Sequence, residues 1–214
     1  MIKYIINYDQ NVLCFHEYDR ITTTIQAFCA KRSRHGTMND GWNICEDGCY
    51  KPNKNTSVWV MSTVNDKMNA ESIDLHHGIK VYRHKPSITS GQNAIAVTPK
   101  NKSGLFDHSA KLGVWSNEVK KRSNSRDVFI LDVKNLTEKV LSDVIKDGLL
   151  KTMQQLSIRI NYTEHQTGIR YLSALKHLRR LFQLGFRIYW SKPEWSCILQ
   201  NKNRTSCVYL DMVR

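Results

Sequence analysis

The second half of the chain alternates short apolar runs with amphipathic segments, a pattern typical of strands alternating with helices. The apolar runs predict strands because they are rich in β-branched and aromatic residues and are bounded by polar ones. The helices are predicted from apolar stripes, such as Leu172, Leu175, Leu178, Leu181 and Phe182. The predicted strands are Val128–Val133, Leu156–Ile160, Phe186–Trp190 and Ser206–Met212, and the predicted helices are Leu136–Leu150 and Gly168–Leu184.

The first half gives a weaker pattern. Residues 1–34 are expected to be helical, since Ile21, Ile25 and Phe28 are spaced i, i+4 and i+7. Residues 35–56 contain several glycines among polar residues and are expected to form a loop. Further along, the sequence predicts strands at Val58–Val64, Ile79–Tyr82 and Ala94–Val97 and a helix at Met68–His76.

This order of elements predicts an α/β fold with a mostly parallel central sheet, because the helices act as right-handed crossovers between strands. The short polar link before the last strand favours an antiparallel terminal strand, so the plan resembles the Rossmann-like class I methyltransferases. We expect residues 1–56 to form a helical and loop lead-in packed on the core, and residues 57–214 to form the α/β domain. Such sheets bind ligands at the carboxyl ends of their strands, where strand order reverses.

The chain is strongly basic, with 32 Lys and Arg against 19 Asp and Glu in 214 residues and a net charge of +13. This excess favours an anionic partner, either RNA, another phosphate-bearing ligand or an acidic protein. The alternative is a basic surface that serves solubility alone. The densest basic positions, and the candidate contacts for such a partner, are Lys120, Lys121, Arg122, Arg179 and Arg180.

Six cysteines permit three disulfides without implying them. Cys45 and Cys49 have the spacing of half a zinc site, but His76 and His77 are adjacent and would point to different faces of an element. We therefore assign no metal.

No signal peptide is visible, since Met1–Asn7 is too short an apolar run, and no stretch is long enough to span a membrane. A cytoplasmic location is the default, but glycosylation sequons leave secretory passage open at Asn55, Asn101, Asn135, Asn161 and Asn203.

Several blocks resemble the methyltransferase-like 24 group of the class I S-adenosylmethionine-dependent methyltransferases. The group carries G-G-W-x-[IV]-C-x-D, then V-x-x-F-D-P-S, and later an I-D-x-L-K-x-D-I-E-G block and L-x-x-L-x-x-x-G-F-R-I-F. The corresponding segments here, collinear from about residue 4 to residue 213, are GWNICEDGCYKP at Gly41–Pro52, IKVYRHKPS at Ile79–Ser87, DVFILDVKNLTEKVLSDVIKDGLL at Asp127–Leu150 and LKHLRRLFQLGFRIYW at Leu175–Trp190.

The resemblance implies an S-adenosylmethionine site and a methyl acceptor that the sequence does not name. The matching cofactor positions are Ser62, Thr63, Lys85 and Asp132, and no catalytic residue can be assigned. Methyl transfer needs few catalytic side chains, because the sulfonium is already activated and the protein supplies alignment.

Departures from the group's pattern open a second hypothesis. The turn after the first strand of the domain, residues 61–65, has no glycine, although close approach of a cofactor favours one. Lys85 stands where the group has a ribose-binding Asp, and a lysine accepts no hydrogen bond. Arg159 replaces a Glu. The alternative is therefore a catalytically inactive methyltransferase-like module that binds an anionic partner.

A third hypothesis, a nonspecific nucleic-acid binder, depends on aromatic side chains that would stack on bases. The candidates are Tyr171, Trp190, Trp195 and Tyr209, although such residues are more often core or rim aromatics. No RRM, KH or zinc-finger signature accompanies them, and no Walker loop, G-x-S-x-G elbow or H-E-x-x-H motif is present.

Overall fold

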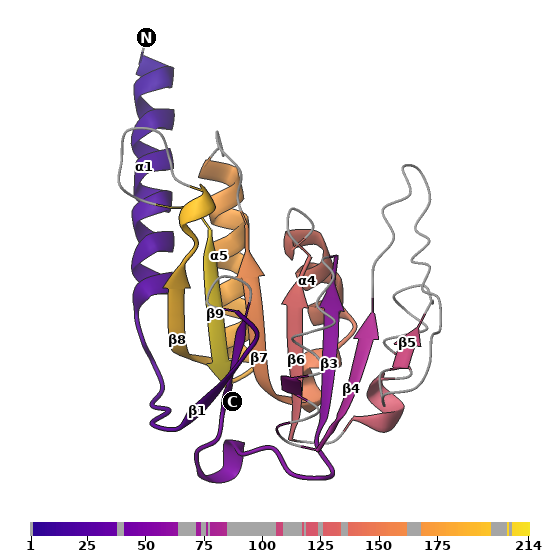
Figure 1. The fold of residues 1–214 in the computed structure, drawn as a ribbon. Helices are drawn as coiled ribbons and strands as arrows, with labels where there is room; N and C mark the ends of the chain where they lie inside the picture. Colours follow the sequence, from indigo (N-terminus) through magenta and orange to yellow (C-terminus); the bar gives the residue numbers. More distant parts are fainter. Residues whose placement is uncertain are drawn as a thin grey trace.

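A computed structural model describes most of the chain. The described residues are 2–37, 41–63, 72–73, 76, 78–84, 106–108, 117, 119–123, 126–133, 137–161, 168–197, 205 and 207–214. Side chains are described from residue 13 onward, except at 106–108, 168–169 and 196. Among them a seven-stranded sheet is covered on both faces (Figure 1).

The sheet has the order β5-β4-β3-β6-β7-β9-β8. Its pairings are parallel from β5 to β7, and β9 runs antiparallel to both of its neighbours. This order, with a reversed strand inserted next to the edge, is that of the Rossmann-like class I methyltransferase fold, and it confirms the predicted fold class. The strands are β3 Ser57–Ser62, β4 Lys80–His84, β5 Phe106–His108, β6 Asp127–Asp132, β7 Met153–Ile160, β8 Arg187–Pro193 and β9 Val208–Val213.

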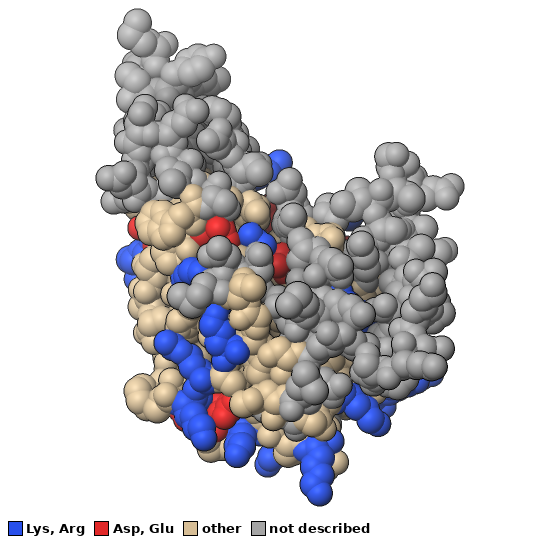
Figure 2. Space-filling model, viewed as in Figure 1, with Lys and Arg blue, Asp and Glu red and all other residues tan. Residues whose placement is uncertain are grey.

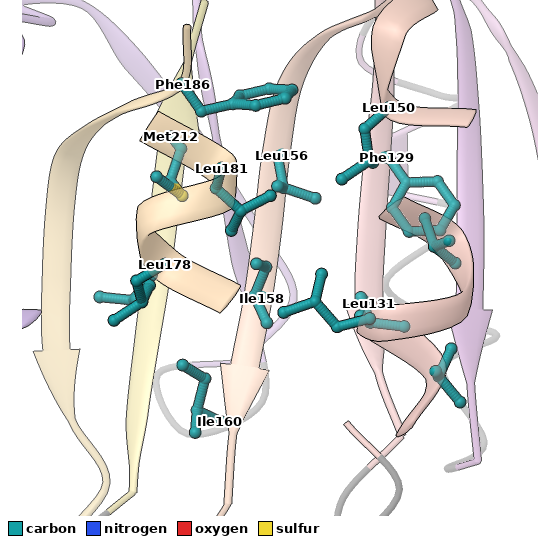
Figure 3. Packing of buried hydrophobic residues seen from close by; sticks show 14 of the residues in the cluster. Phe129, Leu131, Leu150, Leu156, Ile158, Ile160, Leu178, Leu181, Phe186 and Met212 are labelled. Atoms are coloured by element: carbon teal, nitrogen blue, oxygen red, sulfur yellow. The ribbon is translucent and has the colours of Figure 1, made fainter. Parts of the chain in front are cut away.

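One face of the sheet packs against helices. Helix α4 (Thr137–Lys146) and helix α5 (Gly168–Gln183) return the chain between parallel strands, as crossovers must. The buried side chains of α5, Leu178 and Leu181, pack with Ile158 of β7 and Met212 of β9 (Figure 3). The N-terminal helix α1 (Ile2–Thr23) packs on α5 rather than directly over the sheet centre.

The opposite face is covered by a hairpin of β1 (Arg32–His35) and β2 (Trp42–Cys45). Trp42 and Ile44 of β2 share a buried cluster with Val58, Val60 and Ile130 of the central strands. Successive residues of a strand point to opposite faces, so Trp59 and Met61 of β3 belong to the helix-side cluster instead. Burial of both faces explains why β3 and β6 read as continuous apolar runs.

Side-chain hydrogen bonds hold the hairpin on the sheet. Gln155 of β7 accepts from the Cys45 N–H at 2.8 Å and donates to the Cys45 carbonyl at 3.0 Å. Asn43 Nδ2 donates to the buried carboxylate of Asp211 at 2.7 Å, and Tyr189 Oη donates to the Asn43 carbonyl at 2.9 Å. The hairpin therefore supplies partners for polar groups that would be costly to bury alone.

The structure differs from the sequence expectation mainly before β3. Helix α1 ends at Thr23, and Phe28 is 82% exposed, so the predicted helical stripe through Ile25 and Phe28 is wrong. Residues 32–35 and 42–45 are strands rather than helix and loop, because tertiary contacts with the sheet override weak local preferences. Strand β5 was not predicted, and the predicted strand Ala94–Val97 lies outside the described residues.

The second half follows the predicted elements with adjusted ends. The predicted helix Leu136–Leu150 is shorter, because α4 ends at Lys146 and Gly148 adopts a left-handed φ of 70° before a 3₁₀ turn at Leu149–Thr152. Leu172 of the predicted α5 stripe is 54% exposed. Tyr171 and Ala174 are buried in its place, because α1 covers that side of α5 and the Phe15 ring lies 5.2 Å from that of Tyr171.

Asp211 gives a testable pH dependence. Its complete burial raises its pKa to about 6, while hydrogen bonds from Ser157 and Asn43 oppose the rise. A carboxyl whose pKa is raised by folding contributes most to stability below its unfolded pKa of about 4, and this contribution is lost as the pH rises through about 6. In the wild type, ionisation of Asp211 should lower the unfolding free energy by on the order of 3 kcal/mol between pH 4 and pH 7. We expect the Asp211→Asn variant to lack this decrease.

Urea unfolding of the two proteins at a series of pH values measures this difference. Asp147→Asn is the matched control, because Asp147 is exposed just after α4 and should leave the pH profile unchanged. Equal slopes for the wild type and Asp211→Asn would show that Asp211 titrates normally.

Candidate functional site

The candidate site lies where the order of the sheet reverses. From β3 the chain proceeds outward through β4 to β5 on one side, and then returns to place β6 and β7 on the other side of β3. The carboxyl ends of β3 and β6 therefore flank the switch point at which open α/β sheets bind ligands. In Figure 1 these ends are the tips of neighbouring parallel arrows.

Ser62 and Asp132 are register partners at this edge, and the Thr63 N–H donates to the Asp132 carbonyl at 3.0 Å. The structure thus brings together three of the four residues predicted for the cofactor. Ser62 and Asp132 are buried, with 4% and 3% of their surface exposed. The Thr63 Oγ1 atom is buried and makes no hydrogen bond within the described part of the chain. The fourth residue, Lys85, lies outside the described residues.

A charged network extends from Asp132 across the next strands. Arg159 of β7 lies 3.4 Å from Asp132 Oδ2 through one guanidinium nitrogen and 3.1 Å from Glu194 Oε2 through another. Glu194 follows β8, and its backbone N–H donates to the Cys207 carbonyl at 2.9 Å. Tyr209 of β9 is the register partner of Arg159, and the guanidinium carbon lies 4.9 Å from the centre of its ring.

The network shifts the titration of its members. Burial lowers the pKa of Arg159, but the neighbouring Asp132, Tyr209 and Glu194 raise it by more, so the net shift is upward. The pKa of the Tyr209 phenol is raised, mainly by burial and then by its hydrogen bond with Glu194. Arg159 therefore stays cationic and Tyr209 stays neutral at physiological pH, which makes the network a fixed hydrogen-bonding wall rather than a proton carrier.

Sequence reasoning missed most of this network. It identified Arg159 only as a substitution for an expected Glu, and it assigned nothing to Glu194 or to the contact between Arg159 and the Tyr209 ring. The signal that was available is the position of Arg159 near the end of a predicted buried strand, since a buried arginine requires acidic partners. Their identity depends on the β6–β7–β9–β8 pairing, which brings together residues up to 77 positions apart along the chain, from 132 to 209.

A separate groove of about 600 Å³ lies between α4 and α5 on the helix-covered face. Its lining includes the apolar Leu141, Ala174 and Leu178, which also belong to or border the core. Charged side chains around it comprise Lys139, Lys146, Arg170, Lys176 and Arg180 against Glu138 and Asp143. The groove is thus basic, and its volume is within the range of small-molecule sites.

The basic residues predicted to contact a partner are all exposed: Lys120, Lys121, Arg122, Arg179 and Arg180. Arg180 lines the α4–α5 groove, whereas Arg179 interacts with Glu17 of α1 and helps to lower the pKa of that carboxyl after Arg20. The adjacent Arg179 and Arg180 of α5 therefore face different parts of the protein surface. Figure 2 shows that Lys and Arg also outnumber Asp and Glu over the described surface of the hairpin-covered face.

The four aromatic residues considered for base stacking are dispersed. Tyr171 and Tyr209 are buried, the former between α1 and α5 and the latter under Arg159. Trp190 is half-buried, with the guanidinium groups of Arg32 and Arg34 within 6 Å of its ring centre. Only Trp195 of this set is exposed, at 54%. They form no common stacking surface, so the geometry gives the third hypothesis no support.

Four of the six cysteines form disulfides, Cys29–Cys45 and Cys197–Cys207. Cys45 is therefore not half of a zinc site with Cys49, which is exposed. Cys29, Cys45 and Asp47 lie close enough together to hold a metal ion among the described residues. The disulfide removes the two thiolates that such an ion would need, so this cluster does not fit a metal.

No protein-family model matches the chain, and no curated protein matches it. A solved structure, that of M. jannaschii TYW2 in complex with AdoMet, is similar with a TM-score of 0.36 and 10% identity, covering 89% of this chain and 90% of that chain.

No described helix is both long and apolar enough to cross a membrane.

Arg159 is expected to be a stabilising centre of the site. Its side chain is 10% exposed, and its removal would leave the carboxylates of Asp132 and Glu194 buried without their cation. We expect Arg159→Met to lower the unfolding free energy by about 3 kcal/mol, as for other broken buried ion pairs. Chemical denaturation measures the change.

The control is Arg20→Met, which breaks the ion pair between Arg20 and Glu17 on α1. Those side chains are 65% and 46% exposed, so solvent screening should leave the stability nearly unchanged. A similarly small effect for Arg159→Met would mean that Asp132 and Glu194 are hydrated or protonated in the folded protein.

Proposed function

We propose that this protein is a divergent relative of the methyltransferase-like 24 group and binds S-adenosylmethionine at the carboxyl edge of its sheet. The observation that carries the proposal is the convergence of Ser62, Thr63 and Asp132 on the switch point between β3 and β6. The sequence resemblance independently selects the same three positions. Bound S-adenosylmethionine supplies an electrophilic methyl group, so the chain contributes positioning and exclusion of water.

The described residues fit this cofactor in part. The Thr63 hydroxyl, which is buried and has no hydrogen-bond partner among the described residues, is suited to a polar group of a ligand at the switch point. The Thr63 N–H is already bonded to Asp132, so β3 pairs with β6 one residue beyond its own end. Asp132 is likewise engaged, through Oδ2, by Arg159. The cofactor would therefore be held chiefly by Thr63, with Lys85 a further predicted contact.

Arg159 is a positioning residue in this proposal. It fixes the Asp132 carboxylate at one wall of the switch point and links it to Glu194 and Tyr209 at the reversed strand. Because one guanidinium lies between two carboxylates, the wall would offer a methyl acceptor polar groups without a net positive charge.

Calorimetric titration tests the cofactor proposal. We expect S-adenosylmethionine and its demethylated product, S-adenosylhomocysteine, to bind with micromolar dissociation constants. Thr63→Val keeps the shape of the side chain and removes its hydroxyl, so binding should weaken by about fivefold to tenfold, the effect of one hydrogen bond. Thr23→Val, at the exposed end of α1, is the matched control and should bind as the wild type does.

Absence of heat with either ligand, in protein whose circular dichroism shows the native fold, would reject the cofactor site. Unchanged binding by Thr63→Val would reject the role of Thr63 alone.

The basic groove favours a second candidate function, binding of a phosphate-bearing ligand by an inactive methyltransferase-like module. The groove is on the opposite face of the sheet from Ser62, Asp132 and Arg159, so this function does not require the switch point. Three of its cations, Arg170, Lys176 and Arg180, come from α5 alone. Arginine and lysine at one rim of an apolar-floored groove are suited to bind phosphate oxygens.

Adjacent arginines of α5 allow a matched test of this candidate. With adenosine triphosphate in a chelator-containing buffer as the probe, Arg180→Ala should weaken binding by about tenfold, because Arg180 lines the groove. Arg179→Ala removes the same charge from the neighbouring position on the side of Glu17 and should change binding by less than about twofold. Equal losses in the two variants would indicate nonspecific attraction, and fluorescence anisotropy of a labelled nucleotide measures both.

A further inference from the structure

The two disulfides join cysteines that are 16 and 10 residues apart in the sequence. Cys29–Cys45 ties the segment before β1 to the end of β2, and Cys197–Cys207 closes the connection between β8 and β9. Cys45 and Cys207 are completely buried. The Asp47 carboxylate accepts hydrogen bonds from the N–H groups of Ala30 and Lys31, which follow Cys29. These bonds hold the two segments joined by the first disulfide. Both links are therefore integral to packed regions.

Disulfides of this kind persist in oxidising compartments and are rare where glutathione keeps thiols reduced. The sequence gives a second, independent sign of such a compartment in its sequons, of which two have a described acceptor, Asn55 and Asn161. An N-linked glycan needs an acceptor side chain that the folded protein leaves in solvent. The surroundings of these two asparagines differ in this respect.

Asn55 is exposed in the turn that precedes β3. Its N–H donates to Asn53 Oδ1 at 2.9 Å, and the Thr56 hydroxyl accepts from the Asn53 N–H at 3.0 Å, so the backbone of the turn is fixed from within. The turn lies at the amino end of β3, opposite the carboxyl edge that carries Ser62 and Thr63. A glycan at Asn55 would therefore extend away from the candidate site.

Asn161 is half-buried at the end of β7. Its Oδ1 atom lies 3.3 Å from Cys197 Sγ and 3.1 Å from Cys207 Sγ, and its side chain borders the α4–α5 groove. A glycan there would have to leave through the groove. We propose that the chain matures in an oxidising compartment of the secretory pathway, where Cys29–Cys45 and Cys197–Cys207 form and Asn55, in preference to Asn161, receives an N-linked glycan.

The disulfides form by loss of two electrons and two protons from each thiol pair, and the oxidant is the disulfide of a thiol oxidase or isomerase resident in such a compartment. The glycan is transferred from a lipid-linked oligosaccharide to Asn55 Nδ2, with loss of one proton from that nitrogen and release of the lipid pyrophosphate. The inference is independent of the proposed ligands, since it involves neither the switch point nor the groove cations.

The test is expression of the full chain behind a cleavable secretory leader in mammalian cells, beside leaderless expression in the cytosol. We expect the secreted protein to yield the peptide pairs Cys29–Cys45 and Cys197–Cys207 and to alkylate at Cys14 and Cys49 without reduction. Glycosidase treatment in ¹⁸O water should label Asn55 with higher occupancy than Asn161. The cytosolic product should alkylate at all six cysteines and melt at a lower temperature.

Asn55→Gln should lose the glycosidase-sensitive mobility shift due to this site, whereas Thr56→Ser, which keeps both the sequon and the hydroxyl of the turn, should retain it. An unmodified Asn55 in the secreted wild type would overturn the glycan assignment. A cytosolic product with six free thiols and the same melting temperature would overturn the requirement for an oxidising compartment.

Discussion

The constraint on which the rest of the structure depends is burial of both faces of the central strands. Every residue of β3 and β6 is buried, alternately under the helices and under the β1–β2 hairpin. Side chains in the middle of such strands have no access to solvent. Polar groups therefore lie at the strand ends or where a hydrogen-bond partner is present. The switch point is the place where polar strand ends from two neighbours meet, which is why Ser62, Thr63 and Asp132 gather there.

The hairpin is the less regular of the two covers, and it depends on polar as well as apolar contacts. Gln155 completes the hydrogen bonding of Cys45, Asn43 pairs with Asp211, and Cys29–Cys45 ties the hairpin to the segment before it. These interactions fix a two-stranded element that would be only marginally stable alone. They also explain why the buried carboxyl of Asp211 is tolerated despite its raised pKa.

Arg159 stands where the methyltransferase-like 24 group, which the sequence resembles, carries a Glu. Its one cation lies between two carboxylates, and the reversed strand β9 supplies Tyr209 as the register partner of Arg159. The buried guanidinium is therefore compensated by acidic partners that come from β6 and from the end of β8. This arrangement is compatible with a methyltransferase whose cofactor contacts have shifted toward Thr63, and also with an inactive relative that binds through the α4–α5 groove.

The sequence by itself determined the fold class. The apolar runs of β3, β6, β7 and β9 and the apolar stripes of α4 and α5 are long and periodic enough to be recognised despite polar residues within them. It also identified three residues that converge at the switch point, since collinear strand ends must meet at one edge of a parallel sheet. Only the tertiary structure decided the hairpin, both disulfides and the partners of Arg159. Each of these features joins segments whose local sequences do not indicate that they are in contact. Pairing across the sheet brings these segments together, and neither propensity nor periodicity predicts it.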